Sequence, residues 1–177
     1  KRLRSLHERK YRKQTGWFLA EGLRICTEAL RQGFVPQRLL YEEKRHIDPL
    51  IANLITACKK AGGRVLPVTR PLLVKVSNKD NPQTVIGAYQ QFSTNLSEIK
   101  TADVRCWVAL DRIRDPGNLG TIIRTIDAVA ADGVILIDDC TDPFSVESVR
   151  ASMGAIFTHQ VSHCTTEEFI AFKRQFK

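Results

Sequence analysis

The residues of this sequence best suited to chemistry lie in one short stretch, DRIRDPGNLGTIIRT, at positions 111–125. An apolar run at 107–110 precedes it, and a helical pattern follows its Pro-Gly-Asn turn. In open α/β sheets, ligands bind beyond the carboxyl ends of the strands, where such a loop lies. The free N–H groups at the start of a helix also favour an anion. The stretch is therefore a candidate anion-binding site.

Asn118 and Arg124 are the candidate functional side chains of this junction. The sequence predicts a helix over 118–131, with Asn118 as its N-cap and residues 115–117 as the turn before it. Apolar residues recur along this helix at helical spacing, and Arg124 flanks that stripe. The alternative, which spacing alone favours, is that Asn118 only caps the helix and Arg124 is a solvated arginine. The loop has neither a Walker lysine pattern nor G-x-G-x-x-G, which argues against a nucleoside triphosphate or a dinucleotide as ligand.

The composition indicates a globular protein with a basic surface. Of its 177 residues 43% are hydrophobic, and the formal net charge is +8. This charge favours a polyanionic partner such as nucleic acid, although a basic protein that is merely soluble is an equally open alternative. The sequence has no run of about eighteen apolar residues and no signal peptide, so we expect no membrane span and a cytoplasmic location. Its five cysteines are widely spaced, so we expect buried thiols, no disulfides and no metal site.

Strands and helices alternate along the whole chain, which indicates an α/β layer fold. In the first part we expect strands at 18–22, 37–42, 64–68 and 84–90, with helices at 23–33, 48–63 and 70–77. The helix at 48–63 has Asp48 as N-cap and Pro49 at its first position. In the second part we expect strands at 105–110, 133–137 and 156–161, with helices at 118–131, 145–153 and 165–176. The polar segment 93–103 is the expected linker between a domain at 1–92 and a second domain at 104–177.

Two long motifs resemble a known family. LDRIRDPGNLGTIIRTIDA, followed by LIDDCTDPFSVESVRASMGAIF, is similar to the SpoU (TrmH-type) RNA 2′-O-methyltransferases of the SPOUT superfamily. Asn118 and Arg124 match the asparagine and arginine of that family's first motif, and Asp142, Arg150 and Ser152 match its second. Upstream, RKYRKQTGWFLAEG and NPQTVIGAY look like the accessory substrate-binding domain that many members carry. Ala130 departs from the family, which usually has glycine there.

The resemblance implies a function and a fold. It implies methylation of a ribose 2′-hydroxyl in structured RNA, ribosomal RNA rather than tRNA, with S-adenosyl-L-methionine (AdoMet) as the cofactor and no metal. It also implies a small N-terminal α/β substrate-binding domain, then the N-terminal part of a trefoil-knot SPOUT domain with a parallel sheet, and a homodimer formed through that domain. The family's later motifs, which build the knot and most of the AdoMet pocket, do not occur in the sequence. We therefore assign no cofactor-binding residue, and we expect the 177 residues alone to be inactive.

The resemblance places Arg124 at the target nucleotide. An arginine with a pKa of about 13 is neutral at pH 7 only at a cost of about 8 kcal/mol, so we expect a charged Arg124 that holds phosphate and stabilises the nascent alkoxide, rather than a base. Asn118 would orient Arg124 or the ribose. The expected RNA-binding residues are cationic: Arg9, Lys10, Arg12, Lys13, Arg114 and Arg150. A surface role is equally open for Arg150.

Two other functions fit the same sequence. An RNA-binding module that never contacts a methyl donor would show the same basic residues at 9–13, and an α/β interaction scaffold would show the same net charge. We expect the aromatic residues Trp17, Phe18 and Tyr89 to lie in the core rather than to stack on bases.

Overall fold

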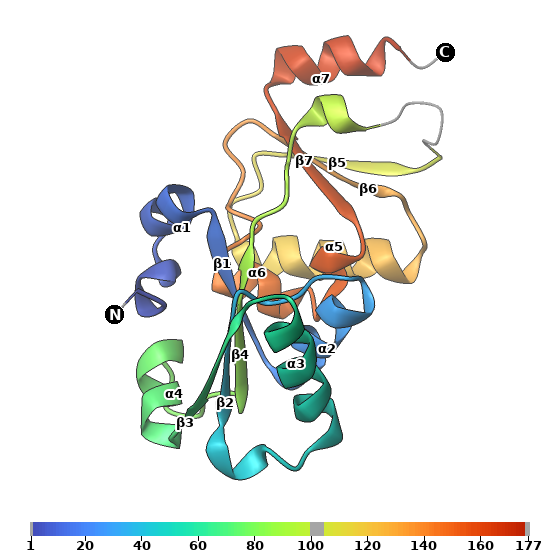
Figure 1. Cartoon of the computed structure of the whole chain (residues 1–177). Coiled ribbons are helices and arrows are strands. Elements are labelled where there is room, and N and C mark those ends of the chain that lie inside the picture. Colours follow the sequence, from blue (N-terminus) through green and yellow to red (C-terminus); the bar gives the residue numbers. More distant parts are fainter. Residues whose placement is uncertain (1, 100–104, 176–177) are drawn as a thin grey trace.

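The computed structural model describes residues 2–99 and 105–175 and contains two β-sheets (Figure 1). The first sheet has four strands in the order β1-β4-β2-β3. They are β1 (Trp17–Glu21), β2 (Arg38–Glu42), β3 (Arg64–Val68) and β4 (Val85–Gln90). In this sheet β4 is antiparallel to both β1 and β2, whereas β2 and β3 are parallel. The sheet is therefore mixed.

The second sheet is fully parallel, in the order β5-β6-β7. Its strands are β5 (Trp107–Asp111), β6 (Gly133–Ile137) and β7 (Gln160–Cys164). The central strand β6 is buried along its whole length, as an apolar run between two parallel neighbours should be. The expected α/β fold with a parallel second sheet is confirmed.

Helices cover both faces of the first sheet. On one face α2 (Leu23–Arg31) and α3 (Pro49–Lys60) contribute to a buried cluster with the sheet. On the other face lie the 3-10 helix η1 (Arg4–His7) and α4 (Arg70–Ser77), with α1 (Arg9–Thr15) beside β1. A short 3-10 turn, η2 (Glu43–Arg45), precedes α3. Asp48 caps α3 by accepting a hydrogen bond from the backbone N–H of Leu50, so its predicted start is confirmed.

The helices of the second part are α5 (Pro116–Ala128), α6 (Val146–Ala151), η5 (Ala155–Phe157) and α7 (Thr166–Lys173). One predicted element is wrong in part. The strand expected at 156–161 begins only at Gln160, because Gly154, with φ 105°, turns the chain into the 3-10 helix η5. Ile156 and Phe157 are thereby buried in the cluster on the first sheet instead of pairing with β6.

The second part of the chain contributes side chains to the hydrophobic core on the first sheet. Phe144 and Phe157, from the second part of the chain, pack on Phe18 and Tyr89 of the first sheet. The ring centroids lie 5.0 Å apart for Phe18 and Phe144, and 5.0 Å apart for Tyr89 and Phe157. Phe18 and Tyr89 are core residues, as expected, whereas Trp17 is only half-buried. Packing of this kind holds the two parts of the chain against each other.

Residues 93–99 of the expected linker pack along the second sheet. The backbone N–H of His163 donates to the carbonyl of Thr94 over 2.8 Å, and the 3-10 helix η3 (Leu96–Glu98) follows. Leu96 and Ile99 join the cluster that includes Phe172 of α7. Residues 100–103 of the expected linker lie outside the described residues. The boundaries of the two domains stay a prediction. None of the described helices is long and apolar enough to span a membrane.

Candidate functional site

After β5, the helix α5 begins at Pro116, two residues earlier than the helix predicted from the sequence. Asp115, not Asn118, is the N-cap: its Oδ1 accepts a hydrogen bond from the backbone N–H of Asn118 over 2.6 Å. Pro116 occupies the first helical position, where its missing N–H costs nothing and its fixed φ suits the helix. The prediction of Asn118 as cap is therefore wrong, and its exposed side chain is free of the capping role.

Arg124 lies on the exposed side of α5, while Leu119, Ile123 and Ile126 form the buried stripe on the opposite side. Within the described residues, Arg124 forms neither an ion pair nor a hydrogen bond. The side chains of Asn118 and Arg124 are not joined by a hydrogen bond. An exposed guanidinium without a carboxylate partner is available to an anionic ligand.

Two further arginines lie at the carboxyl end of β5. Arg112 forms an ion pair with Asp111 over 2.8 Å, and the hydrogen bond from Arg112 lowers the pKa of the Asp111 carboxyl. Arg114, a predicted RNA-binding residue, lies 3.6 Å from Asp139. Both side chains of that second pair are largely exposed, and such pairs contribute little to stability. Arg114 can therefore exchange its carboxylate for a phosphate.

The two motifs of the second domain meet where α5 packs on α6. A Cβ at Gly120 would overlap the carbonyl oxygen of Ser148 and the side chain of Ala151, so only glycine permits this approach. The Ser148 hydroxyl donates to the carbonyl of Pro116 over 3.0 Å and joins α6 to the first turn of α5. Ser152 is fully buried. The small residues of the second motif thus serve close packing, and α5 is the element they pack against.

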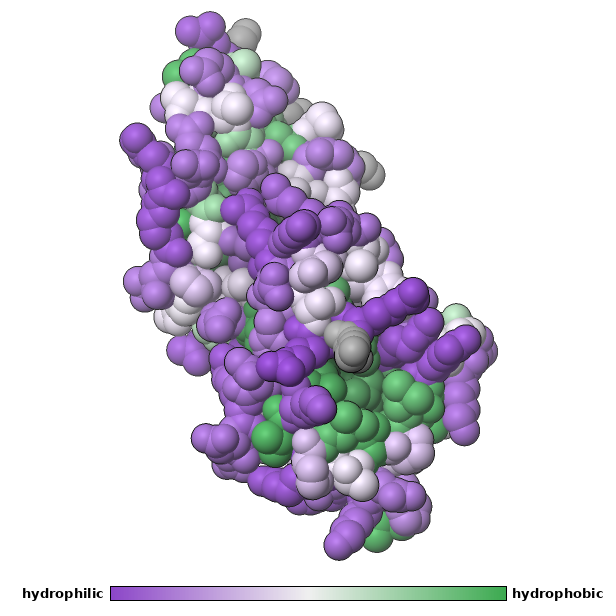
Figure 2. Space-filling view, turned by 90° about the vertical axis from the view of Figure 1, so that its left-hand side faces the viewer, coloured by the Kyte–Doolittle hydropathy of each residue, from purple (hydrophilic) through white to green (hydrophobic). Residues whose placement is uncertain are grey.

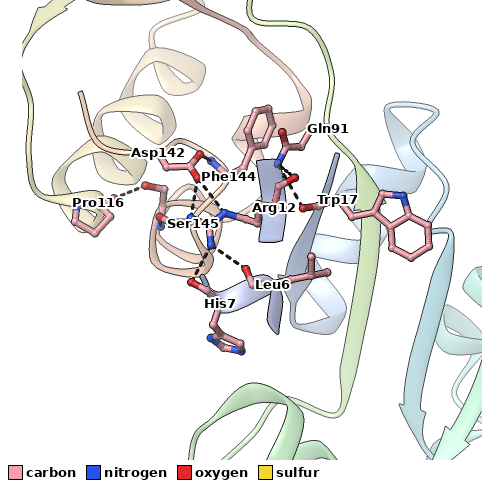
Figure 3. Close-up of polar contacts among 10 residues, drawn as sticks. Leu6, His7, Arg12, Trp17, Gln91, Pro116, Asp142, Phe144 and Ser145 are labelled. Atoms are coloured by element: carbon pink, nitrogen blue, oxygen red, sulfur yellow. Dashed lines mark hydrogen bonds and ion pairs between the residues drawn. The ribbon is translucent and has the colours of Figure 1, made fainter. Parts of the chain in front are cut away.

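Arg12, a predicted RNA-binding residue, is buried in a contact with Asp142 (Figure 3). It is only 3% exposed, and its Nε and Nη2 donate to Oδ2 of Asp142 over 2.9 and 2.7 Å. Its Nη1 donates to the carbonyls of Leu6 and His7, each over 2.8 Å. A guanidinium committed to these acceptors cannot bind phosphate, so the prediction for Arg12 is wrong. Its role is to join α1 to the loop before α6, because Asp142 also accepts from the backbone N–H of Phe144.

The other cations of α1 are exposed. We call them the exposed α1 cluster: Arg9, Lys10 and Lys13. Arg150 of α6 differs from them because it is half-buried and acts electrostatically on the buried Glu21. Burial raises the pKa of the Glu21 carboxyl, and attraction to His7 and then to Arg150 opposes that rise. Arg150 therefore has an internal electrostatic role besides any contact with a ligand.

Sequence reasoning missed the contact between Arg12 and Asp142. The only signal was that Asp142 lies inside the second motif, whereas nothing distinguished Arg12 from the neighbouring cations. Across residues 2–99 and 105–175, no three or more His, Cys, Asp or Glu side chains gather as metal ligands would. All five cysteines are free thiols, and only Cys106 is exposed.

Comparison with known proteins gives two family matches that together cover most of the chain. Residues 1–87 match the MRM3-like substrate binding domain, and residues 105–176 match the SpoU rRNA Methylase family. The first match contains the exposed α1 cluster, and the second contains Asn118, Arg124 and Asp142.

Similar solved structures include an AdoMet-bound rRNA methyltransferase from Sinorhizobium meliloti, 40% identical with a TM-score of 0.89, covering 98% of this chain and 64% of that one. The AdoMet complex of the SpoU methyltransferase AviRb from Streptomyces viridochromogenes is 25% identical, with a TM-score of 0.84, covering 98% of this chain and 67% of that one. Among curated proteins, the 23S rRNA (guanosine(2553)-2′-O)-methyltransferase RlmP of Bacillus subtilis is 31% identical over 155 residues, which is 87% of this chain and 57% of that protein. The chain thus spans little more than half the length of RlmP and about a third of the length of the human mitochondrial rRNA methyltransferase 3.

Proposed function

Because the chain belongs to the SpoU rRNA methylase family, we propose that it forms part of an RNA 2′-O-methyltransferase that methylates a ribose of ribosomal RNA with AdoMet. The observation that carries the proposal is the guanidinium of Arg124, which is exposed on α5 and has no ion-pair partner among the described residues, within the region that matches the family. Relatives described as 23S rRNA 2′-O-methyltransferases support the substrate and the position of the methyl group. Two similar structures that contain AdoMet support the methyl donor.

AdoMet supplies the electrophilic methyl group. The concavities found in the described part of the chain are open clefts, whereas a cofactor site buries most of its ligand. These four clefts therefore do not enclose an AdoMet molecule. The finer proposal is that a polypeptide of residues 1–177 alone does not transfer a methyl group. Because the clefts are open, a second candidate function for that polypeptide is that of an RNA-binding module without catalysis.

Arg124 contributes charge and geometry in the proposed reaction. Its planar guanidinium can donate two parallel hydrogen bonds to a phosphate of the target nucleotide, which fixes the ribose. The same charge stabilises the negative charge that develops on the 2′-oxygen as the methyl group is transferred. The structure provides no hydrogen bond by which Asn118 would orient Arg124, so we propose that Asn118 acts on the RNA directly.

RNA reaches this site through basic side chains, most of which are exposed. The exposed α1 cluster attracts phosphates without regard to sequence, and Arg114 and Arg150 lie on the same domain as Arg124. A homodimer formed through the second domain and a cytoplasmic location remain parts of the proposal. One of the relatives is described as a mitochondrial human rRNA methyltransferase, so location varies among these proteins.

Arg124→Ala in the protein that contains this chain tests the proposal. Methyl transfer to ribosomal RNA should fall by at least about a hundredfold, the usual cost of removing one stabilising donor. Arg124 is exposed, so the fold should persist. Arg24→Ala removes an exposed arginine from α2 and should leave the rate unchanged. Equal rates in the Arg124→Ala variant and the parent protein would overturn the proposal.

A further inference from the structure

One face of the first sheet carries two adjacent arginines. Across the four strands, Leu19, Ala88, Arg38 and Arg64 occupy one row, since each is the Cα partner of the next. Residues paired in this way point to the same face of a sheet. Leu19 and Ala88 are buried, whereas Arg38 is half-buried and Arg64 is exposed at the open edge of the sheet. Arg38 and Arg64 therefore lie on neighbouring strands and on the same face of the sheet.

The pair lacks an acidic partner. Like charges opposite each other on neighbouring strands destabilise a sheet. Within the described residues, neither Arg38 nor Arg64 forms an ion pair that would offset this repulsion, and the Nη1 of Arg38 donates only to the carbonyl of Gln37. An anion bound between the two arginines would relieve their repulsion. The charge of the surface thus fits a phosphate.

Trp17 lies beside the arginine pair. The guanidinium carbon of Arg38 is 5.2 Å from the centroid of the Trp17 ring, within the range of a cation–π contact. Figure 3 shows this ring pointing away from the contact between Arg12 and Asp142, and it packs partly on the core of the same face. A nucleobase stacks on either an indole ring or a guanidinium. Trp17 and Arg38 together provide such a platform.

The surroundings of this platform are apolar and basic. Leu66 of β3 and Leu72 of α4 are 40% and 43% exposed. Figure 2 looks onto the side that carries α1 and α4, and it shows a hydrophobic patch there bordered by hydrophilic residues. The exposed α1 cluster lies on this side too. Apolar surface next to cations suits a strand whose bases are unpaired, because such a strand presents both apolar faces and phosphates.

We propose that the Trp17–Arg38–Arg64 surface binds single-stranded RNA, with phosphate at the arginine pair and a base stacked on the platform. The inference rests on the proposed function, because it takes RNA as the partner, and it adds a second contact region separate from Arg124 and from the exposed α1 cluster. This region would select substrates with an unpaired segment close to the site of methylation.

The test measures binding of a 12-nucleotide oligouridylate by tryptophan fluorescence. Binding should quench the emission, and the quenching should disappear in Trp17→Phe but persist in Trp107→Phe. Arg38→Ala with Arg64→Ala should weaken binding about tenfold and lower the slope of log affinity against log salt by about 1.4, the value for two phosphate contacts on a single strand. Arg24→Ala with Arg45→Ala removes two exposed arginines elsewhere and serves as the control for charge.

The two proposals can fail separately. Suppose that RNA binds and that its affinity depends on the exposed α1 cluster, but that Trp17→Phe is quenched as much as the parent protein and the Arg38→Ala, Arg64→Ala variant binds as its control does. In that case this surface is not an RNA site, and the proposed function stands. If oligoglutamate binds as well as oligouridylate, the surface recognises acidic peptide instead. If no RNA binds to the protein at all, both proposals fail.

Discussion

Removing the guanidinium of Arg12 should destabilise the protein more than removing any exposed arginine. Arg12→Ala leaves the Asp142 carboxylate without its two donors and the carbonyls of Leu6 and His7 without theirs. The side chains of Arg12 and Asp142 are only 4% and 14% exposed, so water replaces the lost bonds poorly. Breaking a buried ion pair on one side costs about 3 to 5 kcal/mol. For a protein of this size, this is a fall in Tm of roughly 6 to 20 °C.

Thermal and urea unfolding measure this loss. The control is Arg112→Ala, because Arg112 and Asp111 form an ion pair over 2.8 Å whose side chains are 61% and 53% exposed. An exposed ion pair contributes little to stability, so the control should unfold almost as the parent protein does. If Arg12→Ala cost no more than Arg112→Ala, Arg12 would not be a structural link between α1 and the loop before α6. The prediction that it binds RNA would then deserve a new test.

Three other perturbations have defined outcomes. Burial raises the pKa of the Glu21 carboxyl above 4.5, so protonated Glu21 contributes its full stability below that value, and this contribution is lost as pH rises through the raised pKa. Glu21→Gln should therefore be more stable than the parent protein at neutral pH and should lose this advantage in acid. Equal stability of the two proteins at both pH values would contradict this reasoning. Gly120→Ala should cost about 1 to 3 kcal/mol in urea unfolding, because its Cβ would overlap Ser148, whereas Gly117→Ala on the same helix has more room and should cost less; equal losses would refute the steric account. Neutralising the exposed α1 cluster should weaken RNA binding at all sequences and flatten its salt dependence, and unchanged affinity at physiological salt would exclude the cluster as a docking surface.

The elements of the fold were predictable where local signals were strong. The start of α3 follows from Asp48 and Pro49, and the buried strand β6 follows from an apolar run between turns. The end of the second motif was not predictable from such patterns. Ile156 and Phe157 have the apolar character of a strand, but they are buried against a sheet formed by residues far away in the sequence.

The site was only partly predictable for the same reason. The spacing of Arg124 beside an apolar stripe placed it correctly on an exposed side of α5. Arg12 could not be separated from Lys10 and Lys13, because its carboxylate partner lies 130 residues further along the chain. The alignment of Arg38 with Arg64 likewise depends on strand pairing, which hydrophobic periodicity does not determine.

The most direct test of the central claim is the position of the transferred methyl group. Ribosomal RNA is incubated with AdoMet and the protein that contains this chain, digested to nucleosides and examined by mass spectrometry. We expect a nucleoside whose additional methyl group is on the ribose, formed by the parent protein and by Arg24→Ala but not by Arg124→Ala. A methyl group found on a base, or ribose methylation that persists in Arg124→Ala, would contradict it.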